Sequence, residues 1–200
     1  YGKKKLYYGI NTYISLSSGI IRYFIELCEV AFRNAGRNGF DFKNPRRLTP
    51  EEQTEAAMYV SRYKINDVET HAPYGRELRQ FTLLLGGIFK RLHWNPKLSE
   101  PEQNHFSTDI QRLSQQTQAF LSHAEMYSIL QKKDETKDKS IEIDSNNIEF
   151  HLNHIYAPYF QISPRKKRKI DIKSEFLEAL ISDDVDKANK VASLIVGDRD

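Results

Sequence analysis

The sequence predicts a mainly α-helical protein, in which a helical bundle is followed by a domain of helices with a small β-hairpin. Three observations predict it. Several segments carry apolar residues at helical spacing, a strong helix-start signal precedes one of them, and two extended pieces flank a cationic stretch near the end. We expect the bundle to span 1–97 and the second domain 98–200, because 95–105 contains two prolines and no periodicity.

The first helix, expected over 19–35, carries the clearest apolar stripe. Ser17 and Ser18 are expected to cap its start, and Gly19 permits a close backbone approach at its first turn. The residues of the stripe recur at intervals of three and four, which is typical of a helix packed on a core. They are Ile20, Phe24, Leu27, Cys28, Ala31 and Ala35.

The opposite face of this helix is charged. Arg22 lies four residues before Glu26, which is the spacing of a helical ion pair. Glu29 and Arg33 repeat the same spacing further along. One interpretation of Arg22 is therefore a member of a solvated row of ion pairs.

The next two helices have clear signals of their own. Thr49 is expected to cap the first of them, with Pro50 at the first helical position and Glu52 completing a capping box. The second is expected over 74–93 and contains Gly86-Gly87. Each glycine costs roughly 1 kcal/mol relative to alanine within a helix, so the pair predicts a close helix contact or a kink.

The second half continues with helices. Apolar residues repeat at helical spacing over 110–130, after a short extended piece. Pro158 divides 148–160 into an expected helix and an extended tail. Ser174 is expected to cap the first of two final helices.

The cationic stretch is the sharpest local feature. Five like charges in succession repel one another unless an anion neutralises them or solvent separates them. Extended pieces at 161–163 and 170–172 flank the stretch, so we expect it to form the tip of a hairpin. A solvated loop and a nuclear localisation signal are the alternatives. The five residues are Arg165, Lys166, Lys167, Arg168 and Lys169.

This order of elements, in which helices are followed by a hairpin with a cationic tip, is that of a winged helix. On such a wing the tip would lie against a phosphate backbone, where it would position the protein without reading sequence. The order of elements therefore makes nucleic acid a candidate partner.

The start of the first helix resembles a known family. A turn of small residues, Gly19, a short gap, Arg22 and an apolar helix are together similar to the start of the lid in AAA+ ATPases of the origin-recognition and initiator type. The resemblance implies that Arg22 is the second sensor, which reaches from the lid to the terminal phosphates of the nucleotide. Ile20 and Ile21 depart from the family, in which polar residues or proline are expected there.

The second half resembles the same family. The stretch 152–163 is similar to the end of the winged-helix module in initiator-type ATPases of bacterial defence loci, and 98–106 is similar to the link into that module. The resemblance implies that the bundle is a lid and that an upstream domain of the same chain is an ATPase that binds ATP and Mg²⁺. It also implies DNA and further copies of the chain as candidate partners.

No catalytic machinery is predicted within this segment. The chain has no glycine-rich phosphate loop and does not begin with Met, so we interpret it as part of a longer protein that holds the nucleotide upstream. No cofactor is expected in the segment itself. His151 and His154 lie three residues apart, but no third ligand has a diagnostic spacing to them, so no metal site is predicted.

Composition favours a cytoplasmic protein. The net charge of +3 is too small to predict nucleic-acid binding by itself, and no apolar run has membrane-spanning length. Cys28 is the only cysteine, which excludes a disulfide framework. A protein-interaction or oligomerisation module without nucleic-acid contact remains the alternative function, because the helix over 110–130 carries polar rather than cationic residues.

Overall fold

The computed structural model describes residues 5–94, 102–133 and 147–197, and its fold is mainly α-helical, as predicted. Three short 3₁₀ helices, η1 (Val68–Thr70), η2 (Ile110–Arg112) and η3 (His154–Tyr156), join larger elements. The α-helices are α1 (Ile10–Ser17), α2 (Ile21–Arg37), α3 (Pro50–Asp67), α4 (Gly75–Trp94), α5 (Gln115–Met126), α6 (Ala157–Phe160), α7 (Ser174–Ile181) and α8 (Val185–Gly197). The strands are β1 (Gln103–Asp109), β2 (Leu130–Lys133), β3 (Asn147–Leu152) and β4 (Arg168–Asp171).

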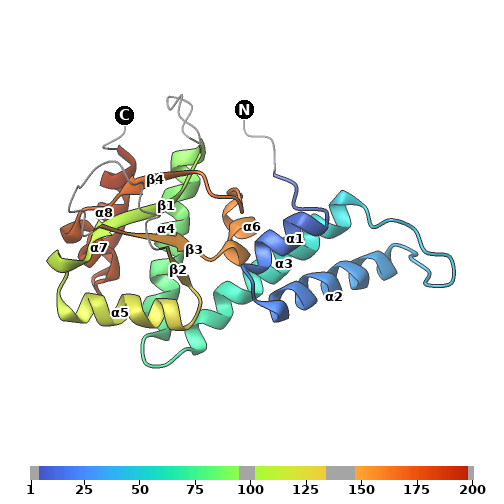
Figure 1. The fold of residues 1–200 in the computed structure, drawn as a ribbon, viewed down its shortest axis with the longest axis horizontal. Coiled ribbons are helices and arrows are strands. Elements are labelled where there is room, and N and C mark those ends of the chain that lie inside the picture. Colours follow the sequence, from blue (N-terminus) through green and yellow to red (C-terminus); the bar gives the residue numbers. More distant parts are fainter. Residues whose placement is uncertain (1–4, 95–101, 134–146, 198–200) are drawn as a thin grey trace, which may run out of the picture.

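The described strands form one small sheet. Figure 1 shows α1, α2 and α3 on one side of the molecule and the sheet with α5, α7 and α8 on the other. The strand order is β2-β3-β1-β4, in which β3 pairs antiparallel with both neighbours and β4 pairs parallel with β1. Helix α4 packs against β1 and β3 and also against α8. No helix in the described ranges combines the length and the apolarity that crossing a bilayer requires.

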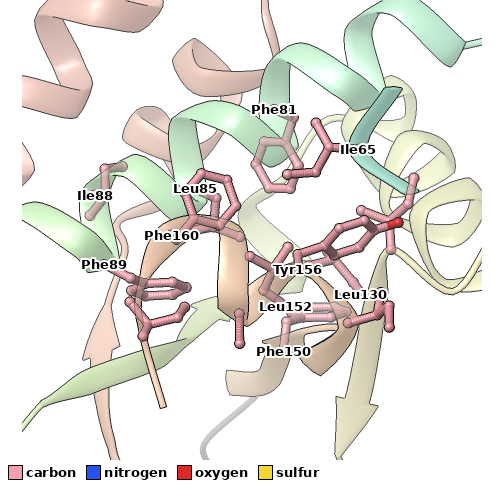
Figure 2. Packing of buried hydrophobic residues seen from close by; sticks show 14 of the residues in the cluster. Ile65, Phe81, Leu85, Ile88, Phe89, Leu130, Phe150, Leu152, Tyr156 and Phe160 are labelled. Atoms are coloured by element: carbon pink, nitrogen blue, oxygen red, sulfur yellow. The ribbon is translucent and has the colours of Figure 1, made fainter. Parts of the chain in front are cut away.

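One face of the sheet belongs to the core. Phe106 of β1 and Phe150 of β3 are directly paired, and their rings stack at a centroid distance of 5.4 Å. Figure 2 shows Phe150 in the same cluster as Phe81 and Leu85 of α4. Because side chains alternate along a strand, the residues beside these phenylalanines lie on the other face of the sheet.

The expected domain boundary between 97 and 98 falls in 95–101, which lies outside the described residues. The division therefore stays a prediction. Residues from the two sides of this boundary are in contact with each other, since the Lys5 ammonium lies 2.6 Å from the Glu102 carboxylate. The Tyr7 hydroxyl also donates a hydrogen bond of 2.8 Å to the carbonyl oxygen of Ile162.

The capping box at the start of α3 is confirmed. The Thr49 hydroxyl accepts from the Glu52 backbone N–H, and the Glu52 carboxylate accepts from the Thr49 backbone N–H at 2.8 Å. The same carboxylate, which is 3% exposed, accepts hydrogen bonds from Arg46 at 2.6 Å and from Asn38 at 3.1 Å. The Arg46 guanidinium and these donors hold the pKa of the Glu52 carboxyl at about 2.

We expect the stabilising effect of Glu52 to depend on pH. Its pKa is about 2 in the folded chain against an ordinary 4.5, so its contribution is present above the ordinary value and is lost as pH falls towards 2. Glu52→Gln keeps the capping box but loses the ion pair with Arg46. The melting temperature of Glu52→Gln should therefore lie below wild type near neutral pH, and the gap should close on acidification. A gap that stays constant down to the lowest pH would contradict this.

The close contact predicted at the glycine pair of α4 is confirmed at Gly86. A Cβ at Gly86 would lie 2.2 Å from the ring of Phe160, whereas a Cβ at Gly87 would meet nothing within 4 Å. Figure 2 shows the Phe160 ring beside Leu85 on this helix. Phe160 is only 4% exposed, so its ring has little room to move away.

This difference between neighbouring glycines predicts opposite effects of the same substitution. Gly87→Ala should raise the free energy of unfolding by up to about 1 kcal/mol through helix propensity. Gly86→Ala should lower it, because overpacking costs about 1–3 kcal/mol and exceeds the propensity gain. Chemical denaturation of the two variants checks this, and equal effects would mean that α6 can shift away from α4.

The hairpin predicted around the basic run was wrong, because the antiparallel pair that follows the chain order lies elsewhere. That pair is formed by β2 and β3. Residues 161–163 are not a strand, because Gln161 ends α6 in the left-handed region with a φ of 59° and the Ile162 N–H donates back to the Ala157 carbonyl at 3.1 Å. The basic run instead leads into β4, whose Ile170 is buried opposite Phe106.

The prediction for 148–160 was also wrong. The expected helix is strand β3, because Phe150 and Leu152 alternate into the core with the period of a strand. The expected extended tail is the short helix α6, in which Pro158 lies in the first turn. Proline is favoured there because its missing N–H has no helical partner to lose.

Candidate functional site

The turn between α1 and α2 determines where Arg22 lies. Ser18 and Gly19 have φ values of 50° and 81°, so the backbone is in the left-handed region at both residues. The predicted capping role of the two serines was wrong, since Ser17 ends α1, Ser18 follows it as the C-cap and Ile20 is the N-cap of α2. The reversal needs a residue that tolerates positive φ, which explains glycine at this position.

Arg22 follows this turn in the first turn of α2, and it is exposed. The predicted Glu29–Arg33 pair is confirmed at 3.6 Å. The expected Arg22–Glu26 pair was wrong, because Glu26 pairs with Lys64 of α3 at 2.7 Å. Within the described part of the chain no hydrogen bond or ion pair engages the Arg22 guanidinium, so it is available to a group outside this segment.

The turn before Arg22 is tied to the sheet. The Ser18 carbonyl accepts from the Gln131 amide of β2 at 3.2 Å, and the Ser18 hydroxyl accepts from the His154 backbone N–H at 3.1 Å. One imidazole nitrogen of His154, Nδ1, lies 3.1 Å from the Ser15 carbonyl oxygen. The start of α2 is thereby held in a fixed position relative to the hairpin strands.

The basic run lies at the surface beside β1. All five of its residues, Arg165–Lys169, are exposed. Its backbone is held by Asn104, whose amide donates to the carbonyl oxygens of Ser163 at 3.0 Å and Arg165 at 2.7 Å. The Asn104 carbonyl oxygen accepts from the Lys167 N–H at 3.0 Å. The run is therefore a surface loop that leads into the start of β4, and the alternative of a solvated loop stays open.

Within the described residues, Lys166 and Lys169 of the run both meet one carboxylate. The Lys166 ammonium lies 2.7 Å from Glu149 Oε2 and the Lys169 ammonium lies 3.8 Å from Glu149 Oε1. Burial raises the pKa of Glu149, but the Lys166 hydrogen bond and the nearby cations outweigh it and lower that pKa below its usual value. Glu149 is therefore ionised at neutral pH. The Arg165 and Lys167 side chains make no such contact within the described ranges, which leaves them open to solvent.

A group of buried polar side chains lies under the run, and sequence reasoning missed it. His105 of β1 is paired with His151 of β3, and the two rings stack at 4.2 Å with an interplanar angle of 8°. His105 Nε2 lies 3.9 Å from Glu149 Oε2. The signal was present as alternation, since Glu149 and His151 are two apart and share one face of a strand. The expectation of a helix over 148–160 concealed it.

The two predicted sites stay separate within the described residues, where no hydrogen bond or ion pair joins Arg22 to the run of Arg165–Lys169. What the structure brings together is the run with Glu149, and the turn before Arg22 with the sheet. A mainly helical fold with an exposed arginine at a helix start and an exposed basic run is consistent with the C-terminal region of an initiator-type AAA+ ATPase.

Comparison with known proteins supports this class. The family model described as ORC-CDC6-like matches residues 1–172. The match covers well over half of the sequence, so the chain belongs to the ORC-CDC6-like family. The resemblance drawn from the sequence is thereby confirmed at the level of the family. No curated protein and no solved structure matches the chain.

Proposed function

We propose that this chain is the nucleotide-sensing and nucleic-acid-contacting part of an initiator-type AAA+ ATPase that works in the cytoplasm. In this proposal residues 1–97 act as the lid and 98–200 as a winged-helix-like module. An upstream domain of the same protein binds ATP and Mg²⁺, and this segment has no catalytic activity of its own. Membership of the ORC-CDC6-like family supports the assignment.

The observation that carries the nucleic-acid contact is the exposed run of five cations from Arg165 to Lys169. Lysine and arginine that neutralise phosphates release counterions, so binding weakens steeply with salt. The run is fixed by Asn104 and so presents its cations in a defined arrangement. Binding of duplex DNA by the wild-type chain, followed over a range of salt concentrations, tests this contact. Absence of salt-sensitive binding would remove it.

The nucleotide-sensing role rests on Arg22. Its guanidinium is exposed at the start of α2, and the turn before it is tied to the sheet through Gln131 and His154. An arginine that reaches the phosphates of a bound nucleotide stabilises the charge that develops during phosphoryl transfer. In this proposal Arg22 supplies that charge to the nucleotide of the upstream domain. ATP turnover by the intact protein is the measurement that tests it.

A second function, protein interaction or oligomerisation without nucleic-acid contact, is favoured by one feature. Phe32 at 42% and Phe42 at 77% exposure stack at 6.0 Å near the end of α2, and Phe40 lies edge-on to both. Exposed aromatic clusters of this kind are common at protein interfaces. Stable oligomers of the chain that bind no duplex DNA at low salt would favour this second function over the first.

A further inference from the structure

The buried polar group beneath the basic run has the composition of a metal site. We propose that His105, Glu149 and His151 bind a zinc-type divalent ion. One ligand atom from each residue lies within 4.8 Å of the other two. Two histidines and a glutamate are a known ligand set for zinc, with the fourth position open to water or an anion. The inference concerns a site that the proposed function does not use.

The strand pairing places the ligands together. His105 and His151 are directly opposite in an antiparallel pair, and Glu149 lies on the same face of β3. Tetrahedral zinc has bonds of about 2.0–2.1 Å, so its ligand atoms lie about 3.3 Å apart. The present separations, 3.9 Å between His105 Nε2 and Glu149 Oε2 and no more than 4.8 Å for any pair, are larger than this by between about 0.6 and about 1.5 Å. Ring rotation and the flexible Glu149 side chain can supply that closure without movement of the strands.

The hydrogen bonds of Asn104 determine which nitrogen of His105 faces the candidate site. The amide nitrogen of Asn104 donates to two carbonyl oxygens, so its own oxygen is the atom that lies 3.2 Å from His105 Nδ1. Nδ1 must carry the proton that this contact needs. Nε2, the atom 3.9 Å from Glu149 Oε2, is then the ring nitrogen that would bind an ion once it carries no proton. Metal-binding histidines are commonly oriented in this way by an acceptor behind the ring.

The two lysines compete with the ion for Glu149. Lys166 at 2.7 Å and Lys169 at 3.8 Å neutralise the carboxylate in the present structure. An ion that takes the carboxylate would displace both ammonium groups, because like charges repel at this distance. Removing the two lysines should therefore strengthen metal binding. Metal bound by histidines without Glu149 would not be strengthened in this way.

The test is direct metal binding to the purified chain. Equilibrium dialysis against Zn²⁺ followed by elemental analysis should give one bound ion per wild-type chain. Co²⁺ should give the intense visible absorption of a four-coordinate site. His105→Gln and His151→Gln should each lower the affinity at least tenfold, whereas the matched control His123→Gln on α5 should leave it unchanged. Lys166→Gln with Lys169→Gln should raise the affinity, and Lys187→Gln with Lys190→Gln on α8 should raise it less.

Several results would overturn the site. They are no bound zinc in the wild-type chain, a Co²⁺ spectrum of a six-coordinate ion, or equal loss in the His105 and His123 variants. Circular dichroism shows whether each variant is folded. If the histidine variants do not fold, Glu149→Gln serves in their place, since it removes the anionic ligand with little change of shape. Metal-induced thermal stabilisation in wild type and its loss in Glu149→Gln would support the site, and equal stabilisation of both would refute it.

Discussion

Reversing the charge of Arg165 and Lys167 should abolish duplex DNA binding at physiological salt. The two side chains are exposed and have no partner within the described ranges, so Arg165→Glu with Lys167→Glu leaves the fold intact. The logarithm of the DNA-binding constant falls linearly with the logarithm of the salt concentration, and each lost phosphate contact makes this slope shallower by about 0.9. Losing two phosphate contacts should therefore lower the affinity for DNA about 60-fold at 0.1 M salt. Repulsion between the new carboxylates and the phosphates lowers it further.

The control for this double variant is an equal change of charge elsewhere. Lys187 and Lys190 of α8 are also exposed, so Lys187→Glu with Lys190→Glu alters the net charge by the same amount. Binding titrations at several salt concentrations should show a reduced slope for the first variant only. If both variants lose affinity equally, overall charge rather than the basic run controls binding. Unaltered affinity in the first variant would remove the run from the interface.

The helices α2, α3 and α4 were predictable because their signals are local. The stripe of α2, the capping box of α3 and the glycine contact in α4 all depend on residues a few positions apart. The hairpin was misplaced because strand pairing is a long-range property. Nothing near Ile170 in the sequence indicates that it will lie beside Phe106, and the parallel pairing of β4 with β1 joins segments about sixty residues apart.

The candidate site divides in the same way. The basic run and Arg22 were found from the sequence because charge runs and helix starts can be read directly. Glu149 was not recognised as a partner of Lys166, because 148–160 was expected to be helical and the contact depends on β3 pairing with β1. His105 was missed for the same reason, since it joins His151 only across the sheet. In both cases a helix was expected where the chain forms a strand. Residues two apart that lie on one face of the sheet were therefore not recognised as neighbours.

Replacing Arg22 with alanine in the intact ATPase should lower ATP turnover by about 10³-fold, the lower end of the range for an arginine that stabilises transferring phosphate. Stability should change by no more than about 0.5 kcal/mol, because the side chain is exposed. Arg22→Lys should recover little of the activity, since a compact ammonium cannot donate to phosphate oxygens in the bidentate manner of guanidinium.

Arg33 provides the matched control on the same helix. It is exposed, and its contacts among the described residues are with Glu29 on the surface of α2 and with the face of Tyr59 at 5.7 Å. Arg33→Ala therefore removes one cation from α2 at a distance from the turn at Gly19, and turnover should stay at the wild-type level. A large loss in Arg22→Ala with no loss in Arg33→Ala places the effect at the helix start. Unchanged turnover in Arg22→Ala would make Arg22 an ordinary surface residue, because a charge that neutralises phosphate in the transition state cannot be removed without slowing the chemistry.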